Sequence, residues 1–81
     1  MTKSNKLLTK FVTARSITWM ELVKVLRVFG YKQIEGSGSR VKFDNGVAAH
    51  IINLHKPHPE KEVKAYALRQ IREKLTEWGY I

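Results

Sequence analysis

The chain contains no cysteine, so neither a disulfide nor a thiolate zinc site can stabilise its fold. Its only two prolines fall close together, at positions 57 and 59. No apolar run approaches the roughly 18 residues that a membrane-spanning helix needs. The basic N-terminus lacks the apolar core of a signal peptide, so we expect a cytoplasmic protein without a membrane partner.

Acidic residues are scarce as well. The chain has 7 of them against 15 lysines and arginines, which gives a formal net charge of +8. Such a charge favours nucleic acid as the partner, ahead of an anionic membrane or an acidic protein. Half of the excess lies in residues 1–17, which carry Lys3, Lys6, Lys10 and Arg15 and no acidic residue.

With 81 residues, the chain is long enough for one small core. We expect a basic leading segment over 1–17 and a single domain over 18–81. In the leading segment, apolar residues at helical spacing predict a short helix within 4–13. Thr18 and Glu21 have the spacing of a capping box, which predicts a helix over 18–29. Gly30 can end that helix in a left-handed conformation.

Three strands and a second long helix follow. Residues 31–35, 39–44 and 47–54 are predicted as strands, and Asn45-Gly46 predicts a tight type I′ hairpin between the last two. The final helix is expected to open at Pro59 or Glu60 and to end near Trp78. Because only one face of the sheet has apolar helix stripes to cover it, we expect an α+β fold with both helices on that face.

Three stretches of the chain together resemble one protein family. They are WMELVKVLRVFGY, GSGSRVKF and LHKPHPEKEVKAYALRQIREKLTEWG. In this order and spacing, from about Thr18 to Ile81, they are similar to the HicA toxins of bacterial type II toxin–antitoxin modules. The lead-in SNKLLTKF is similar to one branch of that family.

The resemblance implies a fold like the double-stranded-RNA-binding domain, with the order α-β-β-β-α. It also implies a metal-independent ribonuclease, with no cofactor, that cleaves messenger RNA and inhibits growth. A HicB-type antitoxin would neutralise it, and DNA would be contacted only indirectly through that antitoxin.

The chain departs from the family pattern at one position. A catalytic histidine usually follows a Gly-Ser pair at the start of the second strand. Aligned on Gly38-Ser39 that position is Arg40, and aligned on Gly36-Ser37 it is Gly38. One alternative is therefore a catalytically degenerate module that only binds RNA or its antitoxin. A DNA-binding module is a third hypothesis, although no helix-turn-helix order is evident.

RNA cleavage without a metal needs a base for the 2′-hydroxyl, a cation for the phosphate and an acid for the leaving oxygen. Histidine suits both proton transfers, and arginine suits the phosphate because it stays charged. We therefore predict His58 first and His55 second as base or acid, with Arg40 as the phosphate clamp. The alternative is that one histidine is solvated and the other bonds backbone at the helix start. The H-x-x-H spacing also suits zinc, but no third ligand is near and we predict no metal.

Two groups of side chains are predicted to contact RNA. Along one strand, Arg40 and Lys42 alternate with apolar residues and share a face. The first group, around this strand and the next loop, is Ser39, Arg40, Lys42 and Lys56. The second, on one flank of the last helix, is Lys61, Arg69 and Arg72. Solvated surface charge is the alternative for both groups, and a plain turn is the alternative for the Gly/Ser segment.

His50, Trp19 and Trp78 are expected to be structural. His50 stands among Ala48, Ala49 and two isoleucines, which favours a partly buried strand residue. A position on the open face beside Arg40 is the alternative. The two tryptophans lie on the apolar stripes of their helices, which favours the core.

Overall fold

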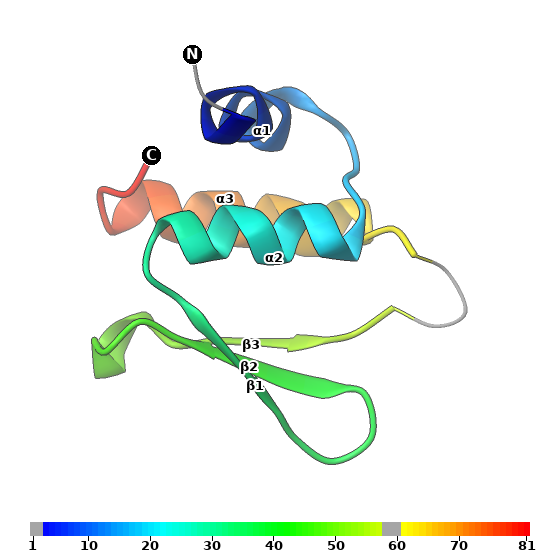
Figure 1. Cartoon of the computed structure of the whole chain (residues 1–81), viewed down its shortest axis with the longest axis vertical. Coiled ribbons are helices and arrows are strands. Elements are labelled where there is room, and N and C mark those ends of the chain that lie inside the picture. Colours follow the sequence, from blue (N-terminus) through cyan, green and yellow to red (C-terminus); the bar gives the residue numbers. More distant parts are fainter. Residues whose placement is uncertain (1–2, 58–60) are drawn as a thin grey trace.

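A computed structural model describes residues 3–57 and 61–81 of the chain (Figure 1). The element order is α1 (Lys3–Thr13), α2 (Trp19–Val28), β1 (Lys32–Glu35), β2 (Arg40–Asp44), a 3₁₀ turn (Ala48–His50), β3 (Ile52–His55) and α3 (Ala65–Glu77). Within these described ranges, no helix is both long and apolar enough to cross a membrane.

The three strands form one antiparallel sheet in the order β1-β2-β3, so β1 and β3 are its edges. Helices α2 and α3 lie together on one face of this sheet, and α1 lies beyond them, away from the strands (Figure 1). The core fills the space between sheet and helices and includes Leu22, Leu26, Phe43, Ile52 and Leu68. The predicted α+β architecture, with α2 and α3 on one sheet face, is confirmed.

Helix α2 begins and ends as the sequence predicts. The Glu21 amide donates to the Thr18 hydroxyl at 3.1 Å, and the Thr18 amide donates to the Glu21 carboxylate at 2.9 Å. These reciprocal bonds satisfy two amides that a helix start leaves unpaired. After the last turn, Gly30 takes a φ of +85°, which glycine adopts without strain.

The leading helix α1 is held to the rest of the domain by one buried ring and by contacts of two basic side chains. Phe11 is completely buried. Arg72 of α3 donates from Nε to the Phe11 carbonyl at 2.6 Å and from a terminal nitrogen to the Ala14 carbonyl. Lys10 pairs with Glu21 at 2.6 Å. The predicted short helix is therefore confirmed, and it is docked against α2 and α3.

The expected tight hairpin at Asn45-Gly46 is wrong. The Asp44 carboxylate accepts from the Gly46 amide at 2.8 Å, and the Asn45 side-chain oxygen accepts from the Val47 amide at 3.1 Å. Because these side chains bond the backbone locally, the chain does not reverse at once. It passes through the 3₁₀ turn instead, and β3 starts at Ile52 rather than at Val47.

The last helix also starts later than predicted. Residues 61–63 are extended and lie beside the entry to α2, because the Trp19 amide donates to the Lys61 carbonyl and the Val63 amide to the Ile17 carbonyl, both at 2.8 Å. Backbone groups used in this pairing cannot close helical turns. Helix α3 therefore begins at Ala65, and Lys61 does not share its flank with Arg69 and Arg72.

Candidate functional site

Strand β2 separates a buried face from a cationic one. Val41 and Phe43 are buried under the helices, while Arg40 and Lys42 are exposed on the opposite, open face of the sheet. Successive strand residues point to opposite sides, so the two cations share this face as predicted. Within the described part of the chain, neither side chain has a hydrogen-bond or ion-pair partner. Both cations are therefore available to an anion.

Arg40 lies directly across from His55 of β3. The Lys56 amide donates to the Ser39 carbonyl at 2.7 Å, and this bond flanks the Arg40–His55 pair. The pair is thus of the non-hydrogen-bonded type, in which the Cα atoms are only about 4.5 Å apart and the side chains are closest. Both side chains are exposed. An imidazole and an unpaired guanidinium are consequently neighbours on the open face.

The Gly/Ser segment forms a turn that places Ser39 beside this pair. The Arg40 amide donates to the Ser37 carbonyl at 3.1 Å across Gly38, whose φ is +60°, the pattern of a type II′ hairpin turn. The Ser39 hydroxyl lies 3.4 Å from His55 Nδ1. A Cβ at Gly36 would lie 3.3 Å from the Arg40 carbonyl, so Gly36 allows the close approach that shapes the turn.

A shallow hollow of about 540 Å³ covers this part of the sheet. Side chains of all three strands line it, including Ile34, Arg40, Lys42, Asn53 and His55. Lys56 lies near its end and pairs with Glu35 at 3.6 Å, with both side chains about half exposed. Exposed pairs of this kind contribute little, so Lys56 can exchange this partner for a ligand.

The sequence prediction missed Asn53. It pairs across the sheet with Lys42 and is exposed on the same face as His55. The sequence contained a signal for it, because residues i and i+2 of a strand lie on the same face, as Asn53 and His55 do. It became usable only when the register placed β3 beside β2.

The predicted cations of the last helix are not brought to this hollow. Arg69 is exposed on α3, in the helical layer on the other side of the sheet, and Lys61 precedes that helix. Arg72 is half-buried and bonds two backbone carbonyls. It holds α1 in place, so its predicted role as an RNA contact does not suit its surroundings.

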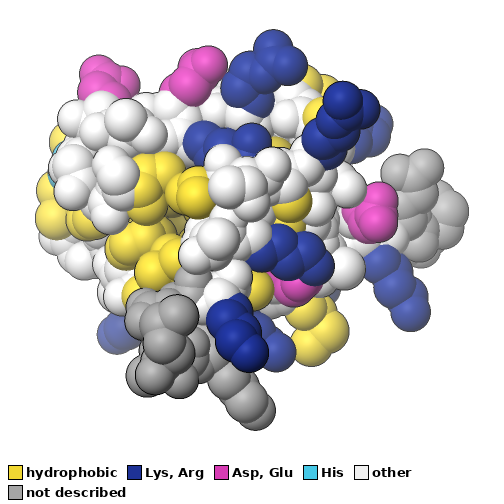
Figure 2. Space-filling model, turned by 90° about the horizontal axis from the view of Figure 1, so that it is seen from above, with side chains coloured by type: hydrophobic (Ala, Val, Ile, Leu, Met, Phe, Trp, Pro, Cys, Tyr) yellow, Lys and Arg dark blue, Asp and Glu magenta, His cyan; other side chains and the backbone are white. Residues whose placement is uncertain are grey.

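Positive charge is not confined to the open face. Figure 2 looks onto the α1 side and shows lysines and arginines spread among acidic and hydrophobic side chains. Net charge alone therefore does not locate a site. Within residues 3–57 and 61–81, what distinguishes the open face is a histidine placed directly beside unpaired cations.

His50 lies outside this arrangement, at the other end of the sheet. Its ring stacks on Trp78 with centroids 4.4 Å apart, and its Nδ1 lies 2.8 Å from the Tyr80 hydroxyl. Its carbonyl accepts from the Tyr31 hydroxyl at 2.7 Å. The structural interpretation of His50 is confirmed, although it lies in the 3₁₀ turn rather than mid-strand. Trp19 is buried, whereas Trp78 is only partly buried.

The remaining predicted histidine, His58, lies outside the described residues. Over 3–57 and 61–81, no three histidine, aspartate or glutamate side chains gather closely enough to hold a metal ion.

The fold and this face define a class of protein: a small α+β domain in which helices cover one face of a three-stranded sheet. The other face of the sheet is uncovered and carries basic side chains. A family model described as the HicA toxin of bacterial toxin–antitoxin systems matches residues 19–77, most of the chain. The protein belongs to the HicA toxin family, as its resemblance predicted. No curated protein and no solved structure matches it significantly. Family membership makes it the toxin of a toxin–antitoxin pair, which suggests an antitoxin as its partner.

Proposed function

We propose that this toxin is a metal-independent endoribonuclease that cleaves single-stranded messenger RNA at the open sheet face. The observation that carries the proposal is the cross-strand pair of Arg40 and His55, exposed and without a described partner for the guanidinium. Growth inhibition then follows from loss of transcripts, and a HicB-type antitoxin neutralises the protein.

In the proposed reaction, the ribose 2′-oxygen attacks the adjacent phosphorus and the 5′-oxygen leaves. His55 takes the 2′-hydroxyl proton or protonates the leaving oxygen, since imidazole is suited to both tasks near neutral pH. Arg40 and Lys42 stabilise the negative charge that grows on the phosphate oxygens. The products are a 2′,3′-cyclic phosphate and a free 5′-hydroxyl.

The second proton transfer is assigned to His58, the sequence candidate three residues beyond His55. Ser39 lies against the His55 ring and is proposed to orient it and to contact RNA. Lys56 contacts the phosphate that follows. Lys61 and Arg69, exposed in the helical layer, are kept as proposed contacts to more distant phosphates of a longer RNA.

A binding function without cleavage is the second candidate, because Arg40 stands where one alignment places the family's histidine. A guanidinium cannot accept the 2′-hydroxyl proton, since it stays protonated at any physiological pH. If His55 does not replace that base, the domain binds RNA or its antitoxin and leaves the RNA intact.

Purified protein incubated with single-stranded RNA in excess chelator separates these candidates. Cleavage that yields cyclic-phosphate ends, and that fails when every ribose carries a 2′-O-methyl group, supports the ribonuclease. Binding that weakens steeply with salt but leaves the RNA intact supports the second candidate. Cleavage that stops in chelator would contradict the metal-independent mechanism.

The antitoxin is expected to be acidic where it meets the toxin, because its contact must cover the exposed cations of the open face. Co-expression of the antitoxin encoded beside this toxin should restore growth. Arg40→Glu should weaken that complex, and an unaffected complex would place the antitoxin elsewhere.

A further inference from the structure

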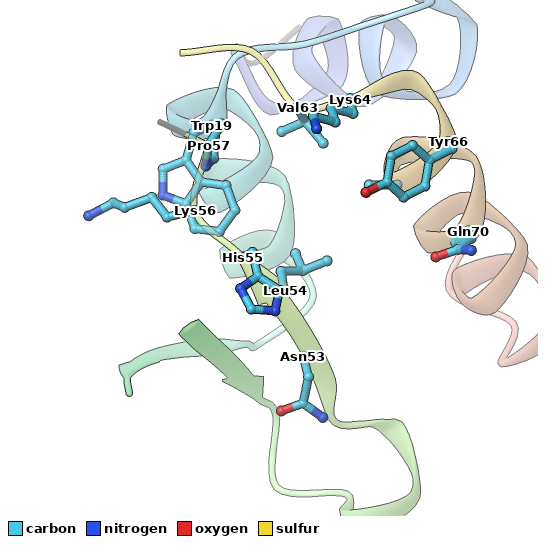
Figure 3. Close-up of a pocket in the computed structure, with 11 residues that line it drawn as sticks. Trp19, Asn53, Leu54, His55, Lys56, Pro57, Val63, Lys64, Tyr66 and Gln70 are labelled. Atoms are coloured by element: carbon cyan, nitrogen blue, oxygen red, sulfur yellow. The ribbon is translucent and has the colours of Figure 1, made fainter. Parts of the chain in front are cut away.

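A second hollow opens at the free edge of β3. Its volume is about 420 Å³. Figure 3 shows Tyr66 and Gln70 projecting from α3 toward the strand, with Asn53, Leu54 and His55 on the opposite side. Because β3 is an edge strand, no further strand of the described residues closes this hollow.

The hollow combines an aromatic wall with a polar rim. Tyr66 is 62% exposed although it is a large hydrophobic residue, whereas Trp19 in the same hollow is only 8% exposed. The side-chain amides of Asn53 and Gln70 provide donors and acceptors. Lys56 and Lys64 add positive charge, and none of the described residues that line the hollow is acidic. This lining would complement a planar group that carries polar atoms at its edge and lies next to an anion.

This edge hollow adjoins the hollow on the open sheet face, where we propose that the phosphate binds. Asn53, Leu54 and His55 line both the sheet-face hollow and the edge hollow. His55 therefore stands at the boundary between the two. A nucleotide chain that places a phosphate against Arg40 and His55 must send one of its neighbouring bases toward the β3 edge or away from the protein.

We infer that the edge hollow binds a nucleobase of the RNA, the base adjoining the phosphate held at Arg40 and His55. The inference rests on the proposed function. Tyr66 stacks on the face of the base, as aromatic side chains do in single-strand-binding proteins. Asn53 and Gln70 contact the base edge, and Lys64 contacts the phosphate on its far side. Only an unstacked base can enter, so single-stranded RNA is selected over duplex.

The test measures binding of a short 2′-O-methyl oligoribonucleotide, which cannot be cleaved by attack of the 2′-oxygen. Tyr66→Ala should weaken its binding roughly tenfold or more, the expected effect of losing one stacked base. Tyr66→Phe should bind nearly as the wild type does. Val28→Ala, at an exposed apolar position of a different helix, α2, is the control and should leave RNA binding unchanged. Inorganic polyphosphate, which has charge but no bases, should bind wild type and Tyr66→Ala alike.

An abasic nucleotide moved along the oligonucleotide then identifies the bound base. At one position, loss of the base should weaken wild-type binding about as much as Tyr66→Ala does. Combining that abasic position with Tyr66→Ala should then weaken binding no more than either change alone.

Four results would overturn the inference. Equal weakening of polyphosphate binding by Tyr66→Ala would mean that the ring acts through charge or folding. Unchanged RNA binding by Tyr66→Ala, while Arg40→Ala weakens it, would remove the base site and leave the proposed function standing. Weakened antitoxin binding with unchanged RNA binding would make the hollow a protein contact. If the wild type binds no RNA at all, the proposed function and the inference both fail.

Discussion

His50 and His55 lie five residues apart, and their surroundings differ in every respect that decides function. His50 is stacked on Trp78, contacts the Tyr80 hydroxyl and accepts a bond from Tyr31. His55 is exposed, and its one described polar side-chain contact is the long one to Ser39. A histidine whose polar atoms are used inside the fold stabilises it, while one with free atoms beside cations can act on a ligand.

The same contrast separates two arginines. Arg72 bonds the carbonyls of Phe11 and Ala14, and its guanidinium lies 5.9 Å from the Phe11 ring centroid. The Arg40 guanidinium has no partner among the residues described. Residue type and net charge do not distinguish these arginines. Their environments do, and each of the following predictions tests that difference.

The largest expected effect is that of His55→Ala on RNA cleavage. Removing a general acid or base typically lowers the rate by roughly 10²–10⁴-fold. Because the His55 ring is exposed, the free energy of unfolding should change by less than about 0.5 kcal/mol. Single-turnover cleavage and urea unfolding measure the two effects. A folded variant that still cleaves RNA at the wild-type rate would remove His55 from the mechanism.

Arg40→Ala should lower the cleavage rate by roughly 10²–10³-fold, the typical cost of losing one charge-stabilising donor group. Arg40→Lys should recover part of this rate, since it keeps the charge but loses the planar fork. Arg27→Ala, at an exposed arginine near the end of α2, is the matched control and should cleave normally. Equal losses in both alanine variants would mean that bulk charge matters rather than this site.

Arg72→Ala should leave RNA cleavage unchanged and destabilise the protein by about 2 kcal/mol, because two charged hydrogen bonds to backbone carbonyls are lost. The N-terminal helix should loosen first, which amide exchange of the α1 amides would detect. RNA affinity that falls while stability holds would restore Arg72 as a nucleic-acid contact.

His50→Ala should cost about 1–2 kcal/mol of stability through the lost stacking and hydrogen bond. Its cleavage rate should match the wild type under conditions where both are folded. The His50→Ala variant should therefore lose stability and keep cleavage, whereas His55→Ala should keep stability and lose cleavage. Lost cleavage without lost stability would reverse our assignment of His50.

The smallest effect concerns Glu21. The ion pair with Lys10, followed by the bond from the Thr18 amide, lowers the pKa of this carboxyl below its ordinary value of 4.5. A lowered folded-state pKa stabilises the protein above the ordinary value, and this contribution is lost as the pH falls through the lowered one. Glu21→Gln should therefore cost at most about 1 kcal/mol at pH 7 and less at an acidic pH below 4.5. Urea unfolding at both pH values measures this, and a pH-independent difference would contradict it.

Local patterns predicted much of the fold. The capping box at Thr18, the glycine stop at Gly30 and the alternation along β2 all rest on residues near in sequence, and all three are confirmed. The predictions that failed depended on competition from elsewhere. Residues 61–63 look helical by pattern, but their backbone pairs with the entry to α2. Asn45-Gly46 looks like a hairpin, but the Asp44 and Asn45 side chains bond the backbone first.

The candidate site divides in the same way. The sequence singled out Arg40, Lys42 and His55 as site residues, and their chemical roles stay predictions. It also predicted that the two cations share a face, which the structure confirms. It did not predict that Arg40 and His55 are direct cross-strand neighbours, and it missed Asn53 and the edge hollow beside Tyr66. Those depend on the pairing of β2 with β3 and on where α3 begins.

By itself, the amino-acid sequence determined the order of the helices and strands, the basic charge and the family, because helix caps, apolar periods and residue types act over a few neighbouring positions. Only the tertiary structure decided that His50 and Arg72 are bonded within the fold while His55 and Arg40 are exposed. Hydrogen-bond partners such as Tyr80 and the Phe11 carbonyl come from distant parts of the chain, and their contacts exist only once the chain has folded.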